Sequence, residues 1–270
     1  MAFGKILKLS AISTALLLAG CGGGDIVINT GSGSAENPTT PTTPTSPCPS
    51  FAKQGSAIGG IGKTICEITG TLTADATLTS NIVWSLNGKV AVGNDNANSA
   101  VLTVEPGTTV FGKSGADFFV VSRGSRIRAV GSSSAPIVFT SVNDMIGSVT
   151  ESSAGQWGGI VILGKAPTNK CDPAALASCK IEAEGNAGPY GGDKPTDNSG
   201  IMKFVQVKYA GYEVIKDNEL NGVTFAGVGS GTVVDYLQVH NNLDDGVEFF
   251  GGTVDLKHLV LTGNRDDSLD

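Results

Sequence analysis

The last part of the chain repeats itself at a fixed spacing. Between Val234 and Asp270, seven pairs of identical or similar residues lie 22 positions apart: Leu237/Leu259, Val239/Leu261, Asn242/Asn264, Asp244/Asp266, Asp245/Asp267, Val247/Leu269 and Glu248/Asp270. A repeat of about 20 to 30 residues with alternating apolar positions and no helical period is typical of a β-solenoid, in which each coil stacks on the next. The spacing therefore predicts an all-β chain with coils of about 22 residues, in which Asp244 lies over Asp266 and Asp245 over Asp267.

The composition fits a slim solenoid and excludes nucleic acid as a partner. Glycine accounts for 38 of 270 residues and aromatic residues for 6%, which suits tight, repeated turns around a narrow core. The chain has 18 basic and 25 acidic residues, and without Lys5 and Lys8 of the N-terminal segment the formal charge is 16 − 25 = −9. A chain this negative is repelled by nucleic acids and by anionic membrane surfaces.

The first 20 residues have the features of an export signal. Lys5 and Lys8 precede a short apolar run that is too short to span a bilayer. The following Leu18-Ala19-Gly20-Cys21 resembles a bacterial lipobox, and this resemblance implies lipidation of Cys21 and cleavage just before it. The residue after the cysteine is Gly22 rather than aspartate, which resembles the sorting signal for the outer membrane. A lipidated cysteine carries several acyl chains, and these give a stable membrane anchor. The alternative is an ordinary secretory signal with an incidental cysteine.

Three further segments follow the signal. Residues 21–50 are rich in Gly, Ser, Thr and Pro, a composition that stays solvated and serves as a tether. Residues 51–99 contain short alternating β segments and are expected to form an N-terminal cap, because terminal solenoid units are atypical. Residues 100–270 are expected to form the solenoid, with an insertion at 165–199, and the chain stops in mid-coil, so the C-terminal end is expected to be incomplete.

Four cysteines remain once Cys21 is assigned to lipid. Their proximity in the sequence predicts two disulfides, Cys48 with Cys66 and Cys171 with Cys179, and an exported chain meets the oxidising conditions that these bonds need. A zinc site formed by these cysteines is the alternative, but the four cysteines contain no Cys-x-x-Cys pair and the chain has only two histidines.

Three short sequence segments in the middle of the chain resemble those of a known fold family. They are Val104-Glu-Pro-Gly-Thr-Thr, Arg123-Gly and Ala135-Pro-Ile-Val-Phe-Thr-Ser, and they resemble the first coils of right-handed parallel β-helix proteins, the pectin-lyase-like superfamily. The resemblance implies three short parallel sheets per coil and inward-pointing side chains at five positions: Val104, Val110, Ile127, Ile137 and Phe139.

Two spacings extend the predicted register upstream. Ile137 and Ile160 are 23 residues apart, which suggests one coil. The segment Val205-Gln206-Val207 matches Leu237-Gln238-Val239 at a spacing of 32, so about ten extra residues are expected either at 212–221 or at 226–232.

The stacked polar residues of the last two coils are the candidate binding site. They are Asn242, Asp244, Asp245, Glu248, Asn264, Asp266, Asp267 and Asp270. Adjacent coils lie about 4.8 Å apart, so the carboxylates repel one another unless something compensates their charge. The first interpretation is that Asn and Asp serve as turn residues. The second is a calcium site formed by Asp244, Asp245, Asp266 and Asp267, since stacked loops offer hard oxygen ligands.

The third interpretation is catalysis by paired carboxylates. Asn242-Leu243-Asp244 and Asp266-Asp267 are similar to a motif pair of polygalacturonases, which implies catalytic roles for Asp244, Asp266 and Asp267. The Gly-His-Gly and Arg-x-Lys motifs of that family do not appear before Asp270. Calcium-dependent pectate lyases use a basic residue, and Arg265 is the arginine nearest to the site.

Taken together, the sequence predicts an outer-membrane lipoprotein whose β-helix is a binding or structural surface module. Its expected partners are the membrane, through the lipid anchor, and a glycan or another surface protein. No cofactor other than calcium is expected. The alternative is a polysaccharide-degrading enzyme, either a polygalacturonase-like hydrolase or a calcium-dependent lyase.

Replacing Cys21 with alanine should release the protein from membranes, because no other segment is apolar enough to hold it there. Metabolic labelling with palmitate and membrane sedimentation measure this, and both signals should be lost in Cys21→Ala. A variant that is still labelled and still sediments with membranes would contradict the assignment.

Overall fold

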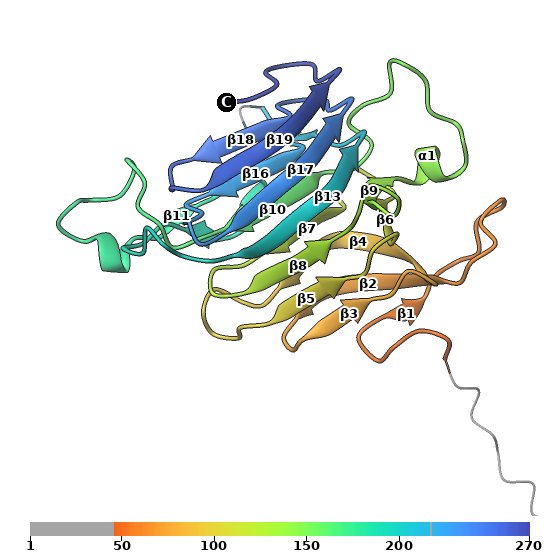
Figure 1. Cartoon of the computed structure of the whole chain (residues 1–270), viewed down its shortest axis with the longest axis horizontal. Coiled ribbons are helices and arrows are strands. Elements are labelled where there is room, and N and C mark those ends of the chain that lie inside the picture. Colours follow the sequence, from red (N-terminus) through yellow and green to blue (C-terminus); the bar gives the residue numbers. More distant parts are fainter. Residues whose placement is uncertain (1–45, 217) are drawn as a thin grey trace, which may run out of the picture. The chain divides into compact units, whose positions relative to one another are not determined.

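The computed structural model describes residues 46–216 and 218–270 (Figure 1). The predicted signal segment, Cys21 and most of the predicted tether lie outside the described residues. Within the described part, parallel strands dominate, and the chain winds through them in successive coils (Figure 1). The helices there are too short and too polar to cross a bilayer.

Three parallel ladders run along the coils, so the chain forms a parallel β-helix. Ladder I joins β2 (Ile65–Leu72), β4 (Val83–Val92), β6 (Thr109–Gly112), β9 (Ile137–Ser141), β13 (Gly200–Lys208), β17 (Val233–His240) and β19 (Asp255–Thr262). Ladder II joins the second parts of β2 and β4 to β7 (Phe118–Val121), β10 (Gly159–Leu163), β16 (Val223–Ala226) and β18 (Val247–Phe250). Ladder III joins β3 (Ala76–Leu78), β5 (Val101–Val104) and β8 (Arg126–Val130) to the first parts of β13, β17 and β19.

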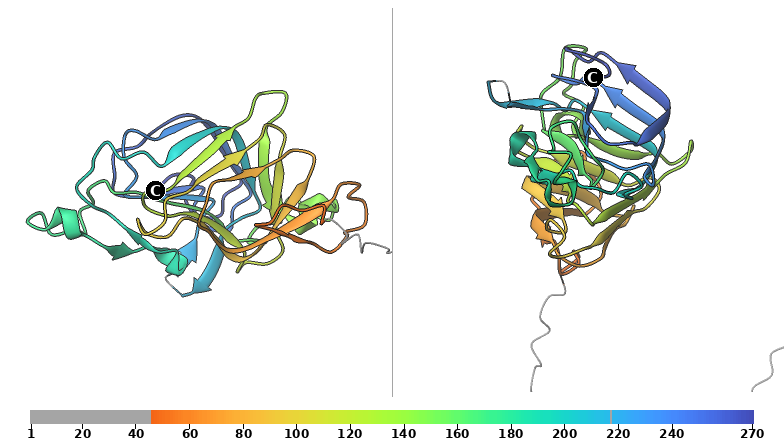
Figure 2. Two further views of the ribbon diagram at one scale, coloured as in Figure 1. Left: turned by 90° about the horizontal axis from the view of Figure 1, so that it is seen from below. Right: turned by 90° about the vertical axis from the view of Figure 1, so that its left-hand side faces the viewer.

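The remaining elements lie outside these ladders. They are β1 (Lys53–Gln54), α1 (Val142–Met145), two 3₁₀ turns (Leu176–Ser178 and Glu184–Asn186), and two antiparallel pairs: β11 (Ile181–Glu182) with β12 (Pro189–Tyr190), and β14 (Tyr212–Ile215) with β15 (Asn218–Leu220). Figure 2 shows the β14–β15 hairpin and the insertion projecting from the sides of the coils.

Alternating apolar residues fill the interior of the coils. The five side chains expected to point inward, from Val104 to Phe139, are each no more than 2% exposed. Because every second residue of a strand faces the same way, each coil delivers one apolar row per ladder to a continuous core. The need to fill this core therefore explains why apolar and polar residues alternate along the strands.

The register confirms the 22-residue period and explains the longer spacing. Leu237 pairs with Leu259, and Val205 pairs with Leu237 as predicted. The ten extra residues of that coil form the β14–β15 hairpin, which is the first of the two expected locations.

The 23-residue spacing between Ile137 and Ile160 does not mark one coil, and that prediction was wrong. Ile137 pairs with Val205 in ladder I, whereas Ile160 pairs with Phe119 and Val223 in ladder II. Apolar alternation is the same on all three ladders, so spacing alone could not separate them. Parallel pairing also begins at Ile65, within the 51–99 segment that the sequence predicts as a cap.

The insertion at 165–199 packs on the outer face of ladder II and builds a second core there. Apolar side chains from both sides form this core: Ala91, Phe118, Val120, Val161, Leu163, Ala183, Ala187, Tyr190, Leu220 and Ala226. The predicted disulfides are both formed, and the one between Cys171 and Cys179 closes a loop within the insertion. The outer face of ladder II is thus covered along part of its length.

Arg123 holds the insertion to the coils from a buried position. Its guanidinium donates to the carbonyl oxygens of Cys179 (2.9 Å) and Gly191 (2.7 Å) and to the carboxylate of Asp95 (2.6 Å). Burial by itself raises the pKa of Asp95, but the hydrogen bonds from Arg123 and Lys180 outweigh that effect and lower the pKa. Arg123 is 4% exposed, whereas the Lys180 side chain, 3.1 Å from the same carboxylate, is 65% exposed.

Substituting Arg123 with methionine should lower the free energy of unfolding by about 3 kcal/mol, because it leaves two carbonyl oxygens unpaired and weakens a buried ion pair. Lys180→Met is the matched control on the same carboxylate, and its cost should stay below ~1 kcal/mol because the lysine is exposed. Urea unfolding of both variants measures the difference. Equal losses in the two variants would refute the anchoring role of Arg123.

Candidate functional site

The candidate site lies in the turns that lead from ladder I to ladder II in the last two coils. The first of these turns joins β17 to β18, and the second turn follows β19 in the next coil. Asp245 and Asp267 are 22 residues apart and adjacent in space, since the backbone N–H of Asp267 donates to Asp245 Oδ1 at 2.9 Å. The stacking that the repeat predicts therefore brings these two turns together.

Two asparagines, one in each turn, hold the backbone of the site in place. Asn242 is fully buried, its Nδ2 donates to the carbonyl oxygen of Asp245 (2.6 Å), and its backbone N–H donates to Asn264 Oδ1 (3.3 Å). Within the described residues, Asn242 Oδ1 and Asn264 Nδ2 have no hydrogen-bond partner. These contacts fix the shape of the turns, which is the local role that asparagine fills well.

The carboxylates form two groups that share Asp245. Oxygens of Asp244, Asp245 and Asp266 lie within 4.8 Å of one another, and so do oxygens of Asp245, Glu248 and Asp270. Asp245 and Glu248 are buried, while Asp266 and Asp270 are exposed. We call these groups the outer triad and the inner triad. Asp267 belongs to neither, although the sequence predicts it as a ligand.

The structure adds Glu184, Glu219 and Asn221 to the site. Asn221 Nδ2 donates to Glu248, and Asn221 Oδ1 accepts from the backbone N–H of Asp245 (3.2 Å). Glu184 belongs to the insertion, and its negative charge raises the pKa of Glu248. Glu219 lies on β15, and its charge raises the pKa of both Glu184 and Asp244. No repeat marks Glu184 and Glu219, because the insertion and the β14–β15 hairpin carry them. Asn221 is the equivalent of Asp245 in the preceding coil, since Val223 pairs with Val247, and the match of Asn221-Gly222-Val223 with Asp245-Gly246-Val247 is the signal that could have found it.

Burial, and after it the negative charge of the site, shifts several carboxyl groups towards the protonated form. Burial, followed by the charge of Glu184, raises the pKa of Glu248 to about 8. Burial and then Glu219 raise the pKa of Glu184 to about 7, and burial and then Asp245 raise that of Asp244 to about 6. The pKa of Asp245 is also raised, first by burial. The site therefore favours either protons or a cation at neutral pH.

A groove of about 540 Å³ opens beside the inner triad. Its lining includes Glu248 and Asp270 and, from the insertion, Lys170 and Tyr190. The Lys170 ammonium lies 5.0 Å from the centre of the Phe250 ring, and its charge partly offsets the pKa rise of Glu184. The groove thus joins a basic residue of the insertion to the acidic turns.

The predicted catalytic residues are only partly assembled. Asp244 and Asp266 meet in the outer triad, whereas the Asp267 carboxylate does not join them. Arg265, the predicted base of a lyase, donates to the carbonyl oxygen of Ser152 in the loop after α1. In this state the guanidinium is engaged with that loop.

Comparison with known families identifies the class of protein. The pectate-lyase-like β-helix domain family matches residues 70–270, most of the chain. The chain therefore belongs to this β-helix family, as the resemblance to the pectin-lyase-like superfamily predicts. No curated protein and no solved structure gave a significant match.

The raised pKa values predict how stability depends on pH. A carboxyl group whose pKa is higher in the folded chain binds more protons when folded, so its stabilising effect is complete at low pH and is lost as pH rises. For Glu248 this loss spans the range from 4.5, its ordinary value, to about 8. Without divalent cations, the melting temperature should be higher at pH 5 than at pH 8, by at least roughly 2–4 °C, equivalent to ~1 kcal/mol.

Glu248→Gln should remove most of this difference and raise the melting temperature at pH 8. Glu213→Gln is the control, because Glu213 is an exposed residue of β14. Calorimetry in EDTA measures both variants. If the pH dependence of Glu248→Gln equals that of the wild type, the burial of Glu248 does not control the titration of the site.

Proposed function

We propose that this β-helix is a calcium-dependent binding module of an exported lipoprotein, anchored in the outer membrane through Cys21. The observation that carries the proposal is the pair of carboxylate triads that share Asp245 and come from consecutive coils. Its partners on the cell surface are a glycan or another protein. The disulfides support export, because such bonds persist in oxidising compartments.

Calcium suits the site because of its charge and its ligand chemistry. Calcium takes six to eight oxygen ligands in flexible geometry and accepts carboxylates, carbonyls and water together. One ion between Asp244, Asp245 and Asp266, or between Asp245, Glu248 and Asp270, would offset the repulsion between these carboxylates. It would also cross-link the two last coils, since each triad draws on both turns.

The neighbouring groove gives the ion a role in binding. Its lining includes Glu248 and Asp270 of the inner triad and Lys170 of the insertion. A carboxylate on an acidic partner is able to bind the free side of the ion and pair with the lysine. Calcium would then convert a repulsive acidic surface into one that accepts acidic groups.

A second candidate function is hydrolysis of a polysaccharide. Its support is the difference between neighbouring carboxyl groups, since Glu248 has a pKa near 8 and acts as an acid at neutral pH, while an ionised partner would act as base or nucleophile. Asp244 and Asp266 are the candidate partners from the polygalacturonase resemblance. The binding role is preferred because Asp267 lies outside the triads.

Calcium should raise the melting temperature of the wild type, because a ligand that binds only the folded state stabilises it by mass action. At about 100 times its Kd the gain is about 2.7 kcal/mol, or roughly 5–10 °C for a domain of this size. Asp245→Asn should abolish most of the rise, since Asp245 belongs to both triads. Differential scanning fluorimetry with calcium and with EDTA measures the shift.

Asp267→Asn is the matched control, because Asp267 occupies the same turns but lies outside both triads. It should respond to calcium as the wild type does. No calcium response in the wild type, or an equal response in Asp245→Asn, rejects the cation site. Release of reducing ends from polygalacturonate by the wild type, lost in Asp266→Asn, would establish the hydrolase instead.

A further inference from the structure

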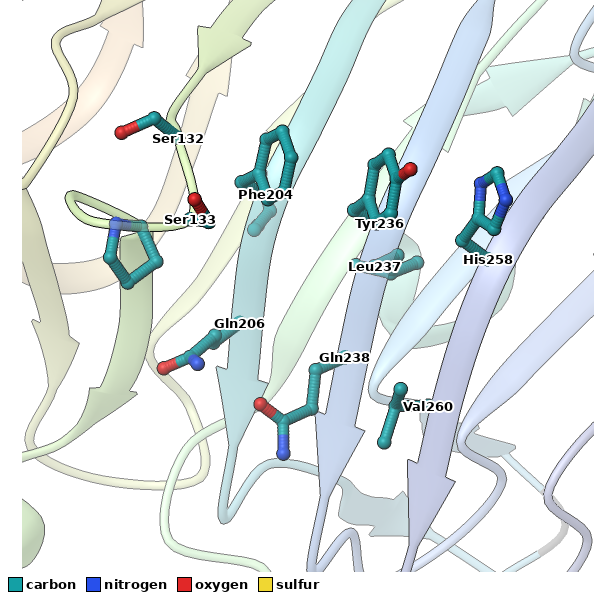
Figure 3. Close-up of a pocket in the computed structure, with 11 residues that line it drawn as sticks. Ser132, Ser133, Phe204, Gln206, Tyr236, Leu237, Gln238, His258 and Val260 are labelled. Atoms are coloured by element: carbon teal, nitrogen blue, oxygen red, sulfur yellow. The ribbon is translucent and has the colours of Figure 1, made fainter.

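A column of three stacked rings lies on the outside of the coils, away from the acidic turns. Phe204, Tyr236 and His258 occupy equivalent places in β13, β17 and β19, at the bend between ladder III and ladder I (Figure 3). Their ring centroids are 4.4 Å apart at each step, and the ring planes differ by 4° and 7°. The column is therefore a regular stack with the spacing of the coils.

The backbone at these three positions has an unusual conformation for such large residues. Their φ angles are 51°, 55° and 52°, in the left-handed region where glycine and asparagine cost least. Strain of this kind is found most often at functional sites, where the side chain is needed for something other than the bend. Tyr236 is 44% exposed and the His258 side chain 59%, so burial in the core does not account for the rings.

The column ends at Phe204 because the preceding coil offers no ring. Val130 pairs with Lys203, so Gly131 is the residue of the preceding coil that is equivalent to Phe204. Beyond it, the turn at Ser132 to Ala135 closes on itself and stands beside Phe204 (Figure 3). A groove of about 170 Å³ lies between this turn and the ring column. Since a cavity of about 150 Å³ holds benzene, the groove accommodates one six-membered ring.

The groove is lined mainly by amide and hydroxyl groups and by aromatic rings. Its lining includes Gln206 and Gln238, side by side on the neighbouring strands β13 and β17, and the hydroxyls of Ser132 and Ser133, but no carboxylate, lysine or arginine (Figure 3). Neither glutamine amide has a hydrogen-bond partner within residues 46–216 and 218–270. Asp235 pairs with His258 Nδ1 (2.7 Å) and with Lys203 (3.3 Å), so the nearby charges satisfy one another.

We propose that this ring column and its groove form a binding site for a neutral hexopyranose unit of a polysaccharide. One face of a pyranose ring is apolar and stacks on an aromatic ring, while its hydroxyl edge needs both donors and acceptors. Phe204 supplies the ring, and each glutamine amide supplies a donor and an acceptor. The absence of lysine and arginine from the lining separates this ligand from the acidic partner expected at the calcium site.

This inference deepens the proposed glycan-binding role but depends on different residues, so either can fail alone. The test is affinity electrophoresis of the full-length Cys21→Ala protein in native gels that contain a soluble β-glucan, a galactan or a mannan. At least one of these neutral polymers should retard the protein, and EDTA should not change the retardation. Failure of all three to retard it overturns the proposal.

Phe204→Asn and Tyr236→Asn remove rings while keeping a residue that tolerates the left-handed backbone. Each should weaken binding at least about tenfold, and Gln206→Ala together with Gln238→Ala should do the same. Tyr212→Asn is the control, because Tyr212 is an exposed aromatic residue on the hairpin outside the groove. Circular dichroism verifies that each variant is folded.

Retardation that survives Phe204→Asn and the double glutamine substitution in folded protein overturns the site. Retardation that calcium promotes and Asp245→Asn abolishes places glycan binding at the acidic turns and also overturns it. Loss of binding in the groove variants, with the calcium response of the melting temperature intact, supports the site whether or not the acidic turns bind a partner.

Discussion

Backbone pairing between successive coils is the interaction on which the rest of this structure depends. Each of the three ladders is held by parallel hydrogen bonds whose register repeats from coil to coil, as between Leu237 and Leu259. A coil that gains residues cannot absorb them without breaking that register on every ladder. Extra residues are therefore expelled at the bends, which is why the insertion at 165–199 and the β14–β15 hairpin project outward.

The same register forces like side chains to stack on one another, with opposite results for different chemistry. Aromatic rings gain from stacking, as in the column from Phe204 to His258, and the stacked asparagines are joined by a hydrogen bond from the Asn242 backbone N–H to Asn264 Oδ1. Stacked carboxylates repel, and burial together with this repulsion raises the pKa values of Asp245 and Glu248, which therefore need protons or a cation. A repetitive fold thus produces both an apolar site and an acidic one from a single geometric rule.

The insertion changes what the coils alone would present. It covers part of the outer face of ladder II with a second apolar core, and the buried Arg123 fixes it there. It also brings Lys170 and Tyr190 into the lining of the groove that contains Glu248. Through these contacts, a loop that interrupts the repeat completes the site that the repeat begins.

The sequence by itself determined the features that are periodic or local. The 22-residue spacing predicts the coils, the alternation predicts the inward rows, and proximity in the sequence predicts both disulfides. The repeat also places Asp245 beside Asp267, because stacking follows directly from the period.

Only the tertiary structure decided the features that depend on non-periodic segments or on the direction of side chains. It placed Ile137 in ladder I and Ile160 in ladder II, which the sequence could not distinguish because apolar alternation is identical on every ladder. It excluded the Asp267 carboxylate from both triads and brought Glu184 to Glu248, because side-chain direction and the fold of the insertion leave no trace in the spacing. It also showed that the rings of Phe204, Tyr236 and His258 stack on the outside of the coils, because the spacings of 32 and 22 residues predict their register but not the direction of their side chains.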